Sequence, residues 1–386
     1  MKRLRTASTR TLLALAAAVA VIAIAGTAIA VAASSSGTPP PAKPLADALH
    51  DALTAPPVDG ITARVTFTNN LFPSGALSAG SASALMSGGS GRLWLTNDGR
   101  GRLELQSDAG DAQILWTDKQ VTVYDASTNS VYKATLPADT TATAAKDTPP
   151  TLAEISTFLT QLAPDANVSD AQPGTAAGQG AYTVTVSPKH DGGLLGSAQL
   201  AWDAASGVPL RVAVYAQGKS TPALELKVTE ISYGSIAASD VNVAPPSDAK
   251  VTDLTGNGSD TQAGDSKPVT GLAAVQAAAG FTVVAPDTLV GLPRQDVRLV
   301  GSADSKHVLV SYGQGLGGIV VIESAATARA DTTQAGLPSV ALDGVTGHEL
   351  PTELGTALFW QRGGVDFVLA GSVPAAAAEA AARALK

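Results

Sequence analysis

Three glycines near the C-terminus have the spacing of a nucleotide-binding loop. Gly313, Gly315 and Gly318 fit G-x-G-x-x-G, which lets a backbone approach a pyrophosphate when a strand precedes the glycines and a helix follows them. Here the residues after Gly318 are 319–322, an Ile/Val run that favours a second strand instead of a helix. The pattern therefore predicts a tight turn between two strands and no nucleotide site.

The remaining residues that could carry out chemistry also form no catalytic pattern. His50, His190, His307 and His348 lie far apart in the sequence and make no short metal-binding motif. Residues 88–91 read GGSG and do not complete the G-x-S-x-G elbow of a hydrolase. The chain has no cysteine, so a thiolate nucleophile or a Cys-ligated metal is excluded. We therefore expect no catalytic residue, no metal and no cofactor, and a protein that is not an enzyme.

The N-terminus predicts export from the cytoplasm. Four basic residues in the first ten positions precede Leu12–Ala33, a run of 22 residues without a charge. Cationic residues before an apolar segment stay on the cytoplasmic side, so the residues that follow are exported. The run is long enough to span a bilayer, yet small residues such as Ala28 and Ala30 would also suit a signal peptidase. Residues 1–33 are thus either a membrane anchor or a cleaved signal peptide, leaving the rest anchored or secreted.

The exported part is acidic. After Ala33 the chain holds 21 basic and 33 acidic residues, a net charge of −12. Such a chain gains nothing from counterion release on nucleic acid and is repelled by anionic head groups. Nucleic acid is therefore not expected as a partner.

Composition divides the exported part into further segments. Residues 34–44 are rich in Ser and Pro and predict a semi-stiff spacer that cannot build a core. A second polar, Gly-rich stretch predicts a linker. The expected segments are the spacer 34–44, a first domain 45–250, the linker 251–270 and a smaller α+β domain 271–386.

The first domain alternates like an antiparallel sheet interrupted by helices. Residues 45–54 carry leucines at helical spacing, and from Ile61 onward the hydrophobic period changes to two. A second helix is expected where Thr151 and Glu154 form a capping-box pattern. Its apolar side chains share one face, and we predict that they form a lid over the sheet: Leu152, Ile155, Leu159 and Leu162.

Tryptophans on the predicted strands leave two interpretations open. Trp94, Trp116 and Trp202 each stand just before a turn, where they could fill an ordinary core. Alternatively, a strongly curved sheet presents them on a concave apolar face that accepts an acyl chain, at about 0.8 kcal/mol per buried methylene. The candidate ligand-binding residues are then Leu93, Trp94, Leu95, Leu103, Trp116 and Trp202.

The order of several short motifs resembles a known family. The sequence reads RLWL at 92–95, WTD at 116–118, VTVYD at 121–125 and PLR at 209–211. Over about residues 45–250 this order resembles the LolA-type lipoprotein carriers and is similar to the related sigma-factor regulatory proteins of the periplasm. The C-terminal part resembles a domain that is often appended to such proteins.

The resemblance implies a fold and two functions. It implies an α+β protein in which an unclosed, curved antiparallel half-barrel of about eleven strands lies under a helical lid. The half-barrel would hold lipid or a lipidated protein, which makes the chain a carrier-like protein without enzymatic activity. The alternative is an envelope sensor of the same fold that binds a membrane-protein partner such as an anti-sigma factor.

Overall fold

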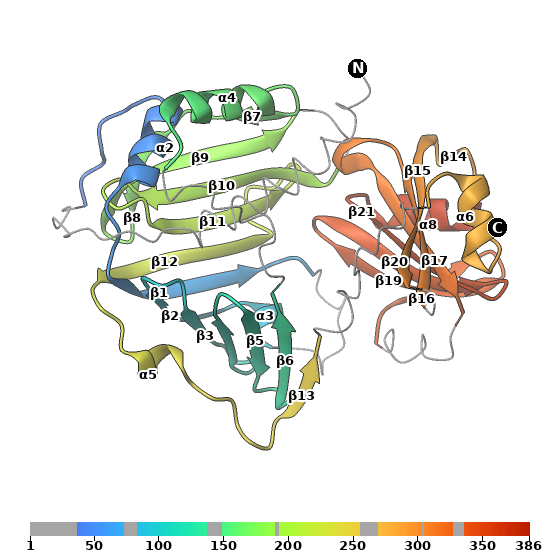
Figure 1. The fold of residues 1–386 in the computed structure, drawn as a ribbon, viewed down its shortest axis with the longest axis horizontal. Coiled ribbons are helices and arrows are strands. Elements are labelled where there is room, and N and C mark those ends of the chain that lie inside the picture. Colours follow the sequence, from blue (N-terminus) through green and yellow to red (C-terminus); the bar gives the residue numbers. More distant parts are fainter. Residues whose placement is uncertain are drawn as a thin grey trace.

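The computed structural model describes residues 37–72, 83–136, 149–189, 193–254, 269–302, 305–326 and 336–386. These residues form a mixed α+β fold made mostly of strands, arranged in two sheets (Figure 1). The helices are α2 (Leu45–Thr54), α3 (Ala84–Ser87), α4 (Leu152–Leu162), α5 (Ala238–Val241), α6 (Leu272–Ala279) and α8 (Ala375–Ala384), with a 3-10 turn η2 (Gly315–Gly317).

The first sheet is a curled half-barrel of thirteen strands among the described residues, where about eleven were predicted. Its strand order is β13-β6-β5-β4-β3-β2-β1-β12-β11-β10-β9-β7, and β8 pairs with β9. The strands are β1 (Gly60–Asn69), β2 (Gly89–Thr96), β3 (Gly101–Gln106), β4 (Ala112–Trp116), β5 (Gln120–Asp125), β6 (Ser130–Thr135), β7 (Ala166–Val168), β8 (Gln172–Ala176), β9 (Gln179–Pro188), β10 (Leu195–Asp203), β11 (Pro209–Ala216), β12 (Leu224–Tyr233) and β13 (Lys250–Asp253).

Two local meanders meet at a single seam in this sheet. Strands β1–β6 pair with their sequence neighbours, as do β9–β12. The seam is the pairing of β1 with β12, in which Ile61 lies opposite Tyr233. The last strand, β13, pairs in parallel with β6, so the sheet extends into the predicted linker 251–270.

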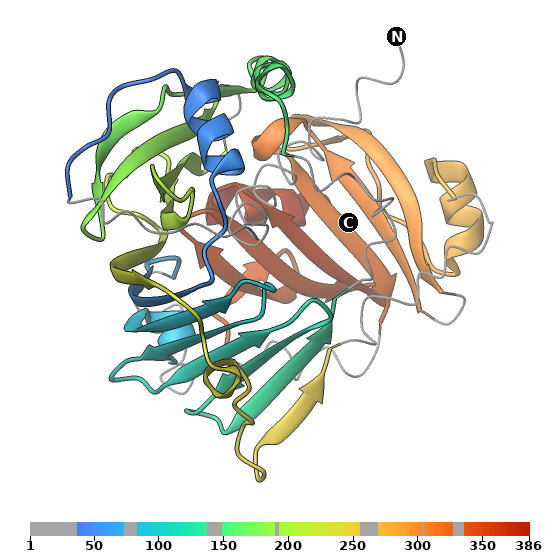
Figure 2. The ribbon, with the colours of Figure 1, turned by 60° about the vertical axis from the view of Figure 1, so that its left-hand side comes forward.

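The two longer helices of the first sheet form for local reasons that the sequence shows. In α4 the Thr151 hydroxyl accepts the Glu154 N–H, and the Glu154 carboxylate accepts the Thr151 N–H at 2.8 Å, which confirms the predicted capping box. Helix α2 ends before Pro56-Pro57, since proline cannot continue a helix. Figure 2 shows α2 lying within the curl of the sheet.

The predicted spacer 34–44 is not a free stalk where the structure describes it. The Gly37 N–H donates to the Gly178 carbonyl, and the Tyr182 hydroxyl donates to the Pro41 carbonyl. Lys43 forms an isolated antiparallel β-bridge with Ala171. From residue 37 onward the segment therefore lies along β8 and β9 as part of the fold. Its proline content made it look extended, and extended segments also pack well on a sheet.

The second sheet has eight antiparallel strands and its own core. Helices α6 and α8 pack on it, chiefly through alanines and Val275. Its order is β14-β15-β16-β17-β21-β20-β19-β18, with β14 (Thr288–Leu289), β15 (Leu292–Ser302), β16 (Ser305–Tyr312), β17 (Ile319–Ala325), β18 (Ser339–Leu342), β19 (Val345–Thr352), β20 (Gly355–Arg362) and β21 (Val365–Gly371).

The glycine pattern at 313–318 is a turn. Strands β16 and β17 pair in antiparallel fashion, with Tyr312 opposite Ile319, and η2 lies between them. The prediction of strand, turn and strand is therefore confirmed. Ser372, a further candidate from the sequence for the N-cap of the last helix, does not cap it, because Pro374 occupies the N-cap position of α8.

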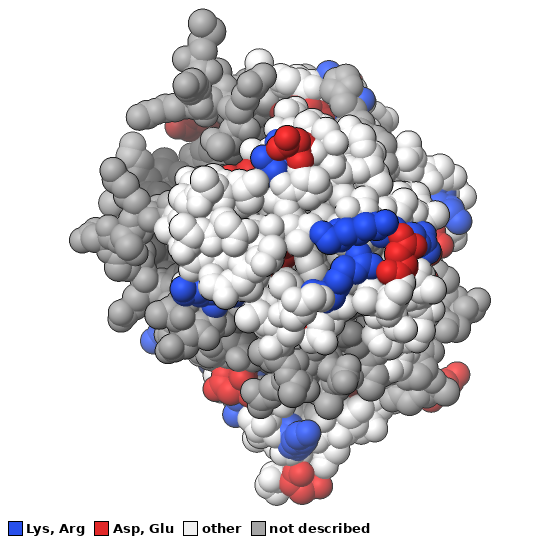
Figure 3. Space-filling view, turned by 90° about the vertical axis from the view of Figure 1, so that its right-hand side faces the viewer, with Lys and Arg blue, Asp and Glu red and all other residues white. Residues whose placement is uncertain are grey.

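Charge on the described surface is sparse and mixed. Figure 3 shows the side of the molecule that carries the second sheet, where Lys and Arg side chains are few and several of them lie next to Asp or Glu. No helix among the described residues has both the length and the hydropathy to span a bilayer. The predicted segment Leu12–Ala33 lies outside those residues.

Candidate functional site

One face of the first sheet is apolar across β1–β6. The strand register places Ala63, Leu93, Leu103, Ile114 and Val123 opposite one another in one row. Paired residues of an antiparallel sheet project from the same face, so the row is a continuous apolar stripe. A parallel row lies beside it, formed by Ile61, Leu95, Gly101, Trp116 and Val121.

The glycine in the second row lets the Trp116 ring lie across the sheet. A Cβ atom placed on Gly101 would stand 2.1 Å from the Trp116 ring, closer than any real contact. Of the predicted ligand-binding residues, Leu93, Leu95, Leu103 and Trp116 therefore share this face. Ile114, Val121 and Val123 were not among the predicted residues, although the alternation of Val121 and Val123 about Thr122 could have identified these two valines.

Trp94 lies on the opposite face. It pairs with Thr62 and Arg102, whose row alternates with the apolar ones. The Arg102 guanidinium carbon lies 4.9 Å from the centre of the Trp94 ring, and Arg102 also donates to the Asp240 carbonyl of α5 at 3.0 Å. Trp94 thus packs beneath an arginine held by α5 instead of lining the face with Leu93 and Leu95.

The same apolar face continues over β9–β11, where helices cover it. Leu45 and Ala48 of α2 are buried with Tyr182, Leu200 and Trp202. Trp202 is 2% exposed, and its ring lies 6.0 Å from that of Tyr182. Trp202 therefore fills the core under α2, the first of the two interpretations open for it.

The lid helix α4 turns three of its four predicted residues inward. Ile155 and Leu162 are buried, and Leu159 packs against the cluster around Trp202. Leu152, the first residue of the helix, is 41% exposed. Of the residues predicted to form a lid, Ile155, Leu159 and Leu162 therefore pack inward, and their role as a lid stays a prediction.

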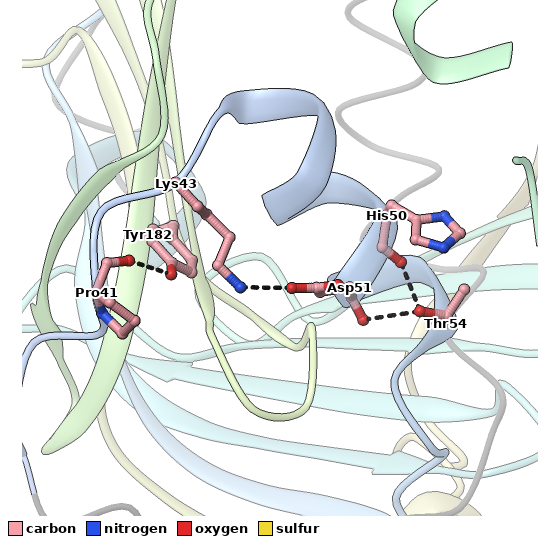
Figure 4. A network of polar contacts seen from close by, with 6 residues as sticks. All are labelled: Pro41, Lys43, His50, Asp51, Thr54 and Tyr182. Carbon is pink, nitrogen blue, oxygen red and sulfur yellow. Dashed lines mark hydrogen bonds and ion pairs between the residues drawn. The ribbon is translucent and has the colours of Figure 1, made fainter. Parts of the chain in front are cut away.

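A polar network fastens α2 and the preceding segment to the sheet (Figure 4). The Lys43 ammonium lies 2.5 Å from the Asp51 carboxylate, and this hydrogen bond raises the Lys43 pKa above its ordinary value. The Tyr182 hydroxyl donates to the Pro41 carbonyl at 2.6 Å, and His50 Nδ1 lies 3.3 Å from the Pro150 carbonyl just before α4. The contacts of Tyr182 and His50 join residues 141 and 100 positions apart, so the local sequence did not predict them.

A cavity of about 450 Å³ opens between α2, α4 and β7. Leu45, Leu159 and Val168 form its apolar wall, while Asp170 and Lys189 lie at its polar rim. Lys189 donates to the Ala163 carbonyl at the end of α4 at 2.5 Å. Asn167 and Ser169 also line the cavity, so its surface is more polar than apolar and differs from the mostly apolar lining that is typical of small-molecule sites.

The chain was compared with protein families, curated proteins and solved structures. No protein-family model matches the chain, and no curated protein matches it. Among solved structures, the MucA/MucB complex of Pseudomonas aeruginosa is 16% identical over 88% of this chain and 96% of that chain, with a TM-score of 0.42. MucB in complex with MucA(peri) is 14% identical over 88% of this chain and 97% of that chain, with a TM-score of 0.41.

A shorter structure covers about half of the chain. The LolA superfamily protein NE2245 from Nitrosomonas europaea is 8% identical over 52% of this chain and 99% of that chain, with a TM-score of 0.23. The chain is similar to MucB and to LolA-superfamily structures. The resemblance stated from the sequence is confirmed to that extent, and identities and TM-scores this low carry no argument about ligand or partner.

Among the described residues, the first sheet is least covered by helices at β4–β6. Among the described residues, helix packing is concentrated on other parts of the sheet, with α3 against β1 and β3 and α4 beside β7. Ile114, Trp116, Val121 and Val123 remain partly exposed, and Tyr132 is 39% exposed. The apolar face thus has a filled half under α2 and an open half on β4–β6.

The described residues bring together no group of His, Asp or Glu that could hold a metal ion. His190 lies outside the described residues, while His50, His307 and His348 belong to different elements. Asp203 supports a turn, since it accepts the Ala205 N–H at 2.8 Å and the Tyr233 hydroxyl at 2.5 Å. The apolar face, with the cavity beside it, is therefore the candidate site.

Proposed function

We propose that the chain is an exported, non-enzymatic protein that holds acyl chains of a lipid or a lipidated protein on the curled face of its first sheet. The observation that carries the proposal is the open half of that face, where an apolar row ends in partly exposed Ile114, Trp116 and Val123. Each methylene buried there would contribute about 0.8 kcal/mol to the binding free energy. For a long acyl chain, the sum of these contributions outweighs the entropic cost of ordering the chain.

The proposal includes the location of the protein. Leu12–Ala33 would hold it in the cytoplasmic membrane, with the two sheets on the extracytoplasmic side. An acyl chain would then be taken up and released close to the bilayer in which such ligands reside.

Native mass spectrometry of the full chain, extracted gently from membranes, tests ligand binding. The expected spectrum contains a bound lipid, and Ile114→Asp removes it because a carboxylate on the face repels a hydrocarbon chain. Leu115→Asp is the matched control: Leu115 is the next residue of β4, is equally partly buried and projects from the opposite face. A ligand-free wild-type chain, or equal loss in both variants, would contradict the proposal.

A second candidate function is binding of a membrane-protein partner, as expected of a sensor. The position of β13 favours it, since β13 is the end strand of the first sheet among the described residues, Val251 within it is 57% exposed and Leu254 after it is 45% exposed. The end strand of a sheet can accept an extended segment through backbone hydrogen bonds. Val251→Pro would abolish capture of a partner ectodomain while leaving bound lipid in place, whereas an acyl carrier without such a partner would show no capture by either form.

A further inference from the structure

Residues 281–287, here called the strap, cover the core of the second sheet between two helices. Helix α6 packs on β15 and β16, whereas α8 packs on β18, β20 and β21. Strand β17 lies between these two groups, and its Glu323 accepts the Val284 N–H of the strap at 2.9 Å. Val283 and Ala285 of the strap are only 9% and 8% exposed. The strap therefore closes the core over the strand that lies between the helices.

Single side chains hold the strap in place. The strap has neither helical nor strand structure. Gln276 of α6 donates to the Phe281 carbonyl at 3.0 Å and accepts the Val283 N–H at 2.9 Å. The Arg294 guanidinium of β15 donates to the Ala285 carbonyl. A segment fixed in this way can open locally at a lower free energy than the paired strands beneath it.

Two polar groups beneath the strap have no hydrogen-bond partner among the described residues. They are the second carboxyl oxygen of Glu323 and the hydroxyl of Tyr312 on β16. Both side chains are buried. Burial raises the pKa of Glu323 to about 7, and burial together with the Glu323 carboxylate raises the pKa of Tyr312. An ionised Glu323 at this position is costly until water reaches it.

The other charged and titratable groups around Glu323 are bonded elsewhere or project from the other face of the sheet. Helix α6 has no such group. The bonded groups lie on α8 and β16 and at the end of the strap: Glu379 with Arg383 at 2.6 Å, Lys306 with the Ala278 carbonyl at 2.7 Å, and Arg294 with Asp287 at 2.7 Å. His307 and Asp366 both lie opposite Ser324, the residue after Glu323, and so project from the other face. Water is therefore the partner that an ionised Glu323 gains when the strap moves away.

We infer that the strap is a pH-sensitive switch, which stays closed over a neutral Glu323 and opens locally when Glu323 ionises. On opening, the bond from Val284 is lost and water solvates both carboxyl oxygens and the Tyr312 hydroxyl. The open state releases the proton near pH 4.5 and the closed state keeps it until about pH 7, so the closed state binds more protons between these values. Closure is therefore most favourable below pH 4.5 and weakens as pH rises to 7. The inference goes beyond the proposed function and depends on neither acyl binding nor the anchor.

Thiol labelling of the full chain tests the switch, and the absence of cysteine makes each label unique. Val283→Cys places a thiol on the strap, and its labelling rate is divided by the rate in the denatured chain at the same pH, which removes the effect of thiol ionisation. Val365→Cys is the matched control, because Val365 is 4% exposed in the same core but lies in the paired strand β21. Both variants are also measured with Glu323→Gln, whose amide cannot ionise and still accepts the Val284 N–H.

The expected relative rate at position 283 rises about 40-fold between pH 5 and pH 7 and is several-fold higher than at position 365. Glu323→Gln should abolish the rise. Equal rates at both positions would show that the strap opens only with the whole core, and a rise that persists with Glu323→Gln would show that another group controls it; either result overturns the inference. Amide exchange at Val284 of the unsubstituted chain, corrected for its intrinsic rate, should show the same rise, and a level rate there would also overturn the inference.

Discussion

At the scale of single residues, Glu323 places a carboxyl group inside the core of the second sheet. Its side chain is fully buried, and one oxygen accepts the Val284 N–H at 2.9 Å. The other oxygen has no hydrogen-bond partner. Burial raises the pKa of Glu323 from an ordinary value of 4.5 to about 7, and the hydrogen bond from Val284 opposes that shift only in part.

Because the pKa of Glu323 is raised in the folded state, we expect the free energy of unfolding to fall as pH rises. The unfolded chain releases the proton at pH 4.5, whereas the folded chain keeps it until about pH 7, so the folded state binds more protons between these values. The contribution of Glu323 to the free energy of unfolding is therefore fully present below pH 4.5. It decreases by roughly 3 kcal/mol as pH rises to 7. Denaturant titrations at several pH values measure this decrease.

Glu323→Gln should remove most of that slope, because the amide keeps the acceptor for Val284 and cannot ionise. Glu353→Gln serves as the control, since Glu353 is partly exposed on a turn of the same sheet. A wild-type stability that is level between pH 4.5 and 7 would show that the buried carboxyl is not responsible for any linkage.

At the scale of elements, local patterns predicted what local forces determine. The capping box at Thr151 and the alternation in β1 are formed by residues close together in the sequence, so the sequence predicted both. Because successive residues of a strand project from alternate faces, the same alternation predicts Trp94 on the face of the sheet opposite to that of Leu93. The packing of residues 37–44 and the parallel strand β13 depend on partners more than a hundred residues away, which composition does not reveal.

Tyr182 is expected to hold the segment 37–44 against the sheet. Tyr182→Phe removes the 2.6 Å hydrogen bond to Pro41 and should lower the free energy of unfolding by about 1 kcal/mol. Hydrogen exchange at the amides of Gly37 and Lys43 should become faster at the same time. Tyr132→Phe, at an exposed tyrosine of β6, should change neither quantity; similar effects in both variants would argue against a specific fastening role.

At the scale of the whole molecule, the two sheets meet at a small junction. The Leu194 N–H donates to the carbonyl and hydroxyl oxygens of Ser372, both at 2.9 Å, and the Glu353 N–H donates to the Leu71 carbonyl at 2.8 Å. Leu316, in the glycine turn, packs so closely on Gly193 that a Cβ there would stand 3.0 Å from the Leu316 Cβ. The glycine pattern that suggested a nucleotide loop thus contributes to this junction.

Ser372→Ala should loosen the junction without unfolding either sheet. The variant loses one acceptor for Leu194 and the hydroxyl's 2.8 Å bond to the Leu354 carbonyl, so we expect faster amide exchange at Leu194. Small-angle scattering should report a larger radius of gyration if the sheets separate. Ser127→Ala, on an exposed turn of the first sheet, is the control, and unchanged exchange at Leu194 would refute the role of Ser372.

The seam between β1 and β12 has a consequence for biogenesis. Ile61 pairs with Tyr233, which follows more than 160 residues later. If the chain is exported as proposed, β1 therefore leaves the translocon with one edge unpaired until β12 emerges. Non-local pairings of this kind slow folding, and bare edges invite association with other chains. The interval between the arrival of the two strands is therefore when a nascent copy is most vulnerable to aggregation, and when a holding chaperone outside the cytoplasm would be most useful to it.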